Sequence, residues 1–514
     1  MLFARAGRRL LAPIAAALAV TLAGCAGGGT GGAAGDPTEI TIADAGFAQA
    51  NFDPTKSDIN VKFYLEPVYD TLIRRMPDGS YTPNLATDWS YEDPTTFVMD
   101  LREGVTFSDG TPFDAEAAKA NIDFQRTGSG PLSGQLAAIS EVSVTSPTQL
   151  RITLSTAFPS LPTVFSSITG MMVAPESLGA ETLATAPVGT GPYVLDTAAS
   201  VPNSSYVYTK RDDYWNSSHF HYETVNIRPI ADTSAMVNAL RNDEVQIGKL
   251  YTIPQLEIKD QAGIPFAGVP YNVDTLWLLD RAGTVVPALG DQRVRQAIGM
   301  AIDRDEIVDG LSKGYAVATS QILKEGMEGY DPALNEQYGF QLDRARQLLA
   351  EAGFAEGFTL PMVSTSSYDQ MTQALAAQLA QVGITLQIDN VPTNQWVTKM
   401  LSGEYAAAYL PYGALDSYYD LGQIVLPDGG FNPFASSDPQ LTDLYARAGS
   451  AATDEERAQL LTQLNTRLTE LAWIIPFQAG ISGIAHSPTV EGVEMSVVEP
   501  PLLYDWTPAP ASSS

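Results

Sequence analysis

The chain of 514 residues contains a single cysteine, Cys25, so no disulfide can form within it. Its fold must therefore be held together by hydrophobic cores alone. About 475 residues follow the N-terminal region, which is far more than one core usually organises, and we expect at least two lobes. A hydrophobic content of 45% with 17% charged residues is ordinary for a globular chain and argues against disorder.

The residues before Cys25 have the pattern of a secretory signal peptide. Three arginines precede an apolar run over residues 10–22, and small residues follow it. Pro13 interrupts this run, which is shorter than the roughly 20 residues that cross a bilayer. The four residues LAGC resemble the bacterial lipobox, whose cysteine is linked to diacylglycerol. We expect a lipoprotein signal peptide over 1–24, a lipidated Cys25 and a flexible glycine-rich tether over 25–37.

The net charge of −30 predicts a strongly acidic surface. Such a surface repels nucleic acid and anionic lipid, and it favours neutral or cationic solutes. The same charge would also keep a protein soluble without any ligand, so both interpretations stay open. We expect no nucleic-acid partner.

Helical and strand patterns alternate in the second half of the chain. Met371, Leu375 and Leu379 form an apolar stripe typical of a helix that ends at Gly383, and residues 384–388 then alternate as a strand. Further helix starts are predicted at Asp291, Asp303, Asp343 and Thr453, and a strand at 473–477. This order of helix, glycine and strand predicts α/β packing. In the first half, the sequences PDG and SDG are typical of hairpins.

Six stretches spread over the chain carry a family resemblance. They are EPVYDTLIRRMPDGSYTPNLATDW (66–89), LREGVTFSDGTPFDAEAAKANIDF (101–124), VGTGPYVL (188–195), KRDDYW (210–215), DQRVRQAIGMAIDRDEIV (291–308) and DRARQLLAEAGF (343–354). They resemble the family 5 solute-binding proteins of ABC importers, which include dipeptide, oligopeptide and nickel-binding lipoproteins. The resemblance runs in register over essentially the whole chain after the tether.

The resemblance implies an α/β, two-lobed periplasmic-binding-protein type II fold with a hinge and an extra subdomain inserted in lobe one. Lobe one would comprise 38–271 and 480–514, with the inserted subdomain at about 52–188, and lobe two would comprise 272–479. The chain would cross between the lobes near Tyr271. A cleft between lobes can enclose a solute and exclude water, which strengthens each polar contact.

The resemblance also implies a set of ligand-binding residues. In peptide-binding members an aspartate on a lobe-two loop pairs with the free α-amino group of the ligand, and the stretch YGALD places Asp416 there. Gly413 stands where the family has a tryptophan, so Tyr412 is the aromatic residue left beside the aspartate. Asp416 could instead cap a turn.

Three more aromatic residues are candidates for contact with the solute. By resemblance, Trp396 begins the helix before the Asp416 loop, Trp277 lies on the strand that enters lobe two, and Phe47 follows the first strand. Core packing is an alternative for both tryptophans. Asp280, where relatives have asparagine, is expected at a solvent-facing strand end.

We expect no catalytic residue, no cofactor and no metal site. His219 and His221 would share one face of a strand, but no third histidine or cysteine ligand lies nearby in the sequence. A Ser-His-Asp hydrolase would have to use one of these two or His486.

The sequence therefore predicts an extracytoplasmic solute-binding lipoprotein that captures short peptides in an interlobe cleft and delivers them to an ABC permease. It would be a monomer, held by its lipid anchor on the extracytoplasmic (periplasmic or outer) face of the cell membrane. The same family could instead bind a non-peptide solute such as an opine, an oligosaccharide or a metal chelate. A secreted lipoprotein hydrolase is the alternative from a different class.

Overall fold

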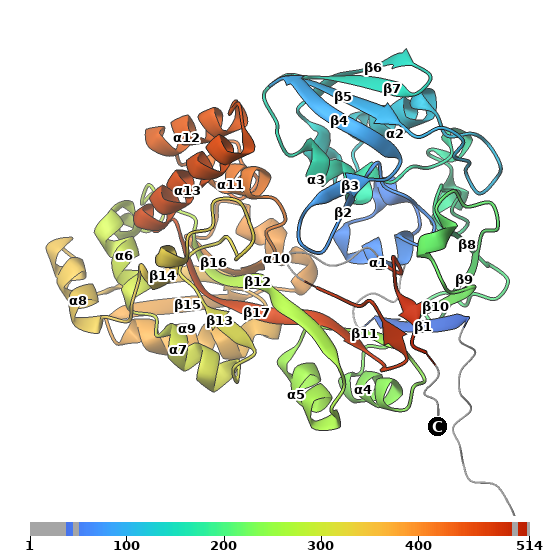
Figure 1. The fold of residues 1–514 in the computed structure, drawn as a ribbon. Helices are drawn as coiled ribbons and strands as arrows, with labels where there is room; N and C mark the ends of the chain where they lie inside the picture. The colour runs from blue at the N-terminus through green and yellow to red at the C-terminus, as the bar shows by residue number, and fades with distance from the viewer. Residues whose placement is uncertain (1–37, 45–50, 496–501, 511–514) are drawn as a thin grey trace, which may run out of the picture. The chain divides into compact units, whose positions relative to one another are not determined.

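Two long antiparallel strands, β12 (Phe266–Leu278) and β17 (Ile474–His486), form the middle of an 11-stranded mixed sheet (Figure 1). The computed structural model describes residues 38–44, 51–495 and 502–510, which belong to one compact unit. Cys25 and Phe47 lie outside the described residues. The order of strands in the sheet is β15-β14-β16-β12-β17-β11-β1-β10-β9-β8, and β13 also pairs with β17.

The other strands of this sheet are β1 (Glu39–Asp44), β8 (Tyr193–Leu195), β9 (Tyr206–Lys210), β10 (Thr224–Pro229), β11 (Ile247–Leu250), β13 (Ala316–Ala318), β14 (Phe358–Ser364), β15 (Ile384–Asn390) and β16 (Ala407–Tyr412). Its parallel pairs are β1 with β10, β1 with β11, β14 with β15 and β14 with β16. Parallel pairs need helical crossovers, so this topology confirms the α/β packing predicted from the sequence.

The central strands β12 and β17 change partners along their length. At one end, residues 266–270 of β12 pair with β17, and β17 pairs on its other edge with β11. At the other end, residues 273–278 of β12 also pair with β16. A register shift lies between Pro270 and Asn272. A second shift lies between Asp274 and Thr275. Since a bulge bends a strand and only the shift at Pro270 also lacks a ladder hydrogen-bond donor, we take the Pro270 shift as the bending point of β12.

A separate four-stranded antiparallel sheet lies within residues 52–188, in the order β4-β5-β7-β6. Its strands are β4 (Ala86–Asp93), β5 (Thr96–Leu101), β6 (Ile139–Ser146) and β7 (Gln149–Leu154), and α2 (Ala115–Thr127) packs on β6. Asp114 caps α2 by accepting a hydrogen bond from the backbone N–H of Ala117. Alternate residues of β7 are buried, as expected for a sheet with one face on a core.

Both predicted turns of the first half are present. Strands β2 (Ile73–Arg75) and β3 (Tyr81–Pro83) form a hairpin through the PDG turn, in which Gly79 has a φ of 86°. At the SDG turn, Gly110 has a φ of 85°, and the N–H of Phe107 donates to Thr111. Only glycine adopts such positive φ angles at low cost.

The helices predicted in the second half are also present, with small shifts. The full set is α1 (Lys62–Leu65), α2, α3 (Leu161–Phe165), α4 (Thr233–Arg241), α5 (Ile253–Ala262), α6 (Gln292–Met300), α7 (Arg304–Glu306), α8 (Leu342–Glu351), α9 (Asp369–Ala380), α10 (Thr393–Met400), α11 (Ser417–Val425), α12 (Pro439–Gly449) and α13 (Asp454–Leu471). Asp291, Asp303 and Thr453 cap α6, α7 and α13 as predicted, whereas α8 begins one residue before Asp343. None of the described helices has the length and apolar character needed to span a bilayer.

Short strands β18 (Val490–Glu491) and β19 (Thr507–Pro508) pair near the end of the described chain. One hydrophobic cluster surrounds Ile40, Val225 and the fully buried Trp506, and a larger one contains the apolar residues of the four-stranded sheet together with those around Trp277. Phe158, which follows β7, packs against the rings of Tyr418 and Tyr419 on α11. The region of the four-stranded sheet therefore contacts the helices that follow β16.

Candidate functional site

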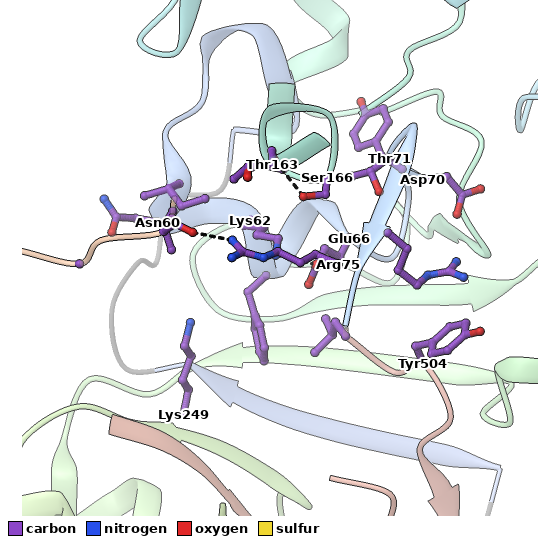
Figure 2. Close-up of a pocket in the computed structure, with 18 of the residues that line it drawn as sticks. Asn60, Lys62, Glu66, Asp70, Thr71, Arg75, Thr163, Ser166, Lys249 and Tyr504 are labelled. Carbon is purple, nitrogen blue, oxygen red and sulfur yellow. Dashed lines mark hydrogen bonds and ion pairs between the residues drawn. The ribbon is translucent and has the colours of Figure 1, made fainter. Parts of the chain in front are cut away.

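A cavity of about 570 Å³ lies where the region of α1, β2 and α3 meets β12 and the loop after β16 (Figure 2). Tyr271 and Asn272 line it from the register shift of β12, and Gly413 and Leu415 line it from the loop. A volume of this order suits a small solute of several residues or rings. The cavity is thus bounded by the bending point of β12 and by the two regions on either side of it.

Charged side chains from α1 and β2 line one side of the cavity. Lys62 forms an ion pair with Glu66, one helical turn further along the chain, with 3.2 Å between the Lys62 Nζ and the Glu66 Oε1. Arg74 donates from Nη2 to the side-chain oxygen of Asn84 at 2.6 Å, and its guanidinium lies 4.1 Å from the ring centroid of Tyr504.

Asp70 is a buried carboxylate in the same wall. It accepts hydrogen bonds from the hydroxyl of Tyr214 at 2.8 Å and from the indole N–H of Trp215 at 3.1 Å. Burial raises its pKa above the usual range, while the positive charge of Arg74 and these hydrogen bonds act in the opposite direction.

Arg75 reaches across the cavity to the loop after β16. Its Nη1 donates to the backbone oxygen of Leu415 at 2.7 Å, the hydrogen bond drawn in Figure 2. Its guanidinium lies 5.6 Å from the ring centroid of Tyr81. Its Nε is buried and has no hydrogen-bond partner among the described residues. Arg75 is therefore only partly satisfied by the protein.

Asp416 joins the same two regions. Its Oδ1 accepts from the hydroxyl of Ser160 at 2.5 Å and from the backbone N–H of Tyr419 at 2.8 Å, and its Oδ2 accepts from the hydroxyl of Thr163 at 2.6 Å. The carboxylate thus caps α11, as the alternative interpretation of the sequence anticipated. Asp416 is adjacent to the cavity, whose lining includes Leu415 and Thr163. Its pairing with an ammonium group stays a prediction.

Asp420, which the sequence analysis did not single out, holds the loop before Asp416 in place through hydrogen bonds. Its Oδ2 accepts from the backbone N–H groups of Leu415 at 2.6 Å and Asp416 at 2.8 Å, and its Oδ1 accepts from the hydroxyl of Tyr412 at 2.7 Å. Burial raises the pKa of Asp420 to about 6. Asp416 and Asp420 are separated by one helical turn, and this spacing in the sequence could have identified Asp420 as a residue of the site.

Tyr412 and Trp277 form an aromatic cluster with Phe431 behind the loop. The ring centroids of Trp277 lie 5.5 Å from Tyr412 and 5.3 Å from Phe431, and its indole N–H donates to the backbone oxygen of Leu410 at 3.2 Å. Trp277 is fully buried. Neither ring is part of the cavity lining, and their contact with a solute stays a prediction.

Trp396, on α10, is also buried, with its ring centroid 5.2 Å from that of Tyr368. Its indole nitrogen has no hydrogen-bond partner among the described residues. A Cβ at Gly413 would lie 2.8 Å from the Asn272 Oδ1, so any larger residue there would require the Asn272 side chain to move.

Asp280 corrects one expectation of the sequence analysis. It is fully buried rather than solvent-facing, and its carboxylate accepts the backbone N–H groups of Thr284, Val285 and Val286. A carboxylate can hold a tight turn in this way, because three peptide donors replace its lost hydration.

The histidines and serines give no enzyme-like geometry within the described residues. His219 stacks on Tyr504 and lies 2.6 Å from the carboxylate of Asp505. No three potential metal ligands cluster in the described part of the chain.

Residues 310–314, GLSKG, have the Gly-x-Ser-x-Gly spacing of a hydrolase elbow. However, Ser312 follows a helical turn, is buried and donates to Gln478 at 2.7 Å, whereas an elbow exposes its serine between a strand and a helix.

Comparisons with known proteins agree with one another about the family. The sequence model of the bacterial extracellular solute-binding proteins, family 5 (middle), matches residues 80–428. The glutathione-binding protein GsiB of Escherichia coli K12 is 28% identical over 319 residues, 59% of this chain and 60% of GsiB. The alignment therefore spans about 60% of the length of that curated relative.

Solved structures extend the likeness to nearly the whole chain. AgaA from A. tumefaciens R10 in complex with agropinic acid has a TM-score of 0.78 at 20% identity, covering 92% of this chain and 99% of that one. DppA from Helicobacter pylori in complex with the peptide STSA has a TM-score of 0.77 at 20% identity, covering 91% and 98%. HbpA2 from Haemophilus parasuis has a TM-score of 0.80 at 21% identity, covering 91% and 99%. These structures confirm the α/β, two-lobed periplasmic-binding-protein type II fold.

Proposed function

Because the chain belongs to family 5 of the bacterial extracellular solute-binding proteins, we propose that it captures a short peptide in this cavity and delivers it to an ABC importer. The observation that carries the proposal is the position of the cavity, which is lined both by the bending point of β12 and by the regions on its two sides. A solute there would contact both lobes at once, so its binding energy can favour the closed arrangement. The activity is binding, and no catalytic step is proposed.

The path of the central strands supports the proposed division into lobes. Lobe one would comprise 38–271 and 480–514, with an inserted subdomain at about 52–188, and lobe two would comprise 272–479. Tyr271 is supported as the crossing point because it lies at the register shift of β12. Gly480, opposite Asn272 on β17, is supported as the returning point.

Asp416 is the proposed partner of the peptide α-amino group. It already accepts two hydroxyl hydrogen bonds and one from a backbone N–H, and an ammonium would replace a hydroxyl donor or share the remaining lone pair. The names of two relatives support a peptide as the solute, since one binds glutathione and another holds the peptide STSA. Tyr412, Trp277, Trp396 and Phe47 remain candidates from the sequence alone: the first three are not part of the cavity lining, and Phe47 lies outside the described residues.

The N-terminal features belong to the same proposal. Lipidation at Cys25, after removal of a signal peptide over 1–24, would hold the protein as a monomer on the extracytoplasmic face of the cell membrane, beside its permease. A lipid anchor keeps the binding protein near the importer and raises the local concentration of loaded protein.

The proposal is tested by native mass spectrometry of the purified protein, followed by small-angle scattering with and without the bound solute. We expect a co-purified peptide of a few residues and a smaller radius of gyration when it is bound. The melting temperature should rise with peptide concentration, because the peptide binds only the folded state. A protein saturated with peptide whose scattering is unchanged would contradict closure, and a co-purified non-peptide solute would contradict the peptide assignment.

A further inference from the structure

The charge of the cavity is opposite to that of the chain. Its charged lining comprises four basic side chains and two carboxylates, in a protein with a net charge of −30. The basic residues are Lys62, Arg74, Arg75 and Lys249, and the acidic ones are Glu66 and Asp70. An acidic surface repels anions at long range, so a local excess of positive charge at the solute site needs its own explanation.

Both carboxylates of the lining already have partners within the protein. Glu66 pairs with Lys62 at 3.2 Å. Asp70 accepts hydrogen bonds from the hydroxyl of Tyr214 and the indole N–H of Trp215. Neither carboxylate is therefore available to Arg75. Among the described residues, the hydrogen bond that Arg75 makes goes to the neutral backbone oxygen of Leu415.

Arg75 has more hydrogen-bond donors than the protein uses. A guanidinium carries five N–H groups, and one of them serves Leu415. The Nε group is buried without a partner among the described residues, which is costly for a charged donor. A planar guanidinium binds a carboxylate through two parallel hydrogen bonds, more strongly than it binds neutral acceptors.

Hydroxyl groups also lie around Arg75. Thr71, Thr163 and Ser166 contribute hydroxyl groups to the same cavity, and Figure 2 shows Thr163, on α3, and Ser166, directly after α3, on the side of the cavity that faces Arg75. Each of these hydroxyl groups already donates within the protein, to the backbone oxygen of Ile73, the carboxylate of Asp416 and the backbone oxygen of Thr163 respectively. A bound carboxylate would gain a hydroxyl donor only by displacing one of these acceptors, so Arg75 is the group that carries its recognition.

We propose that the captured solute is an acid whose carboxylate binds Arg75 inside the cavity. This inference rests on the proposed function, because it takes the cavity as the solute site, and it adds the class of solute. Arg75 contacts the residue that precedes Asp416, so in a peptide the carboxylate belongs near the amino end, on the side chain of one of the first residues. The contact with Leu415 then lets the same guanidinium hold the loop while it binds the solute.

Matched probes separate the charge of the solute from its shape. The tripeptides Glu-Ala-Ala and Gln-Ala-Ala differ by one carboxylate at equal size, and a C-terminally amidated form of each removes the other carboxylate. Calorimetry should show Glu-Ala-Ala binding the full chain at least about 30-fold more tightly than Gln-Ala-Ala. Rising salt should weaken Glu-Ala-Ala more than Gln-Ala-Ala. A large effect of C-terminal amidation with no effect of the Glu-to-Gln exchange would contradict the placement of the bound carboxylate near the amino end.

The variant Arg75→Gln should lose this preference, whereas Arg75→Lys should keep part of it. Arg447→Gln is the matched control, since Arg447 is exposed on α12 and pairs with Asp443 there. The unliganded melting temperatures of the variants show whether they fold. Equal binding of all four tripeptides to wild type, or an equal loss of acid and amide probes in Arg75→Gln, would overturn the inference and leave peptide binding intact.

A separate arm keeps the inference testable if peptides do not bind. Glutarate and its diamide, glutaramide, then serve as a non-peptide acid and amide pair, read by the rise in melting temperature. Stabilisation by glutarate in wild type but not in Arg75→Gln would support an acidic solute while the peptide assignment fails. The absence of stabilisation by any acidic probe would overturn the inference.

Discussion

The carboxylate of Asp416 accepts a hydrogen bond of 2.6 Å from the hydroxyl of Thr163, which ties the loop before α11 to α3. Thr163 in turn lies 2.5 Å from the hydroxyl of Tyr81. The two regions that face each other across the cavity are thus joined by hydroxyl groups. Since a hydroxyl carries no charge, an ammonium group would be the stronger partner for the same carboxylate.

Asp416→Asn separates the charge of this residue from its role as a cap. An asparagine oxygen can still cap α11, so the free energy of unfolding should fall by less than about 1 kcal/mol. Peptides with a free α-amino group should bind at least about 30-fold more weakly, because the ammonium loses its carboxylate. Calorimetry with free and N-acetylated peptides on both proteins measures the effect. If the variant binds free peptide as tightly as wild type, the carboxylate only caps the helix, and a non-peptide solute becomes the better proposal.

Asp420 should make stability depend on pH in an unusual direction. Its folded-state pKa of about 6 lies above the ordinary value of 3.8, so the folded protein binds more protons than the unfolded chain between these values. The contribution of Asp420 to the free energy of unfolding is therefore largest below pH 3.8 and is lost as the pH rises to about 6. Relative to Asp420→Asn, wild type should be about 1 to 3 kcal/mol more stable at pH 4 than at pH 7. Urea unfolding at both pH values checks this, and a pH-independent difference would contradict it.

Trp277→Phe should cost stability rather than affinity. The indole is fully buried, and its N–H donates to the backbone oxygen of Leu410. Losing this hydrogen bond and part of the ring volume should lower the free energy of unfolding by about 1 to 3 kcal/mol. The dissociation constant for the co-purified solute should stay unchanged by calorimetry, since Trp277 is not part of the cavity lining. A selective loss of affinity in a normally stable variant would instead place the ring against the solute.

Cys25→Ala should release the protein from the membrane without changing its folded part. The variant cannot receive diacylglycerol, so it should appear in the soluble fraction or retain its signal peptide. Fractionation and mass spectrometry of the N-terminal peptide measure the outcome, and the unfolding curve of the variant is the control. An acyl group still attached to the variant would contradict the lipoprotein proposal.

Local patterns predicted much of the secondary structure. The caps at Asp291, Asp303 and Thr453 and the glycine turns at Gly79 and Gly110 depend on a few neighbouring residues, so they can be read from the sequence. The burial of Asp280 was predicted wrongly because its three backbone partners belong to a turn, and a turn has no hydrophobic periodicity in the sequence. Burial of a charged residue depends on which donors the fold brings to it.

The sequence by itself determined the family, the α/β pattern and the candidate status of Asp416, since each is carried by short motifs in register. Only the tertiary structure showed that Arg75 and Leu415 meet, although 340 positions separate them in the chain. It also placed basic side chains from α1, β2 and β11 around one cavity, against the net charge of the whole protein. Net charge sums over all residues, whereas a solute experiences the few groups within a Debye length that the fold has gathered around it.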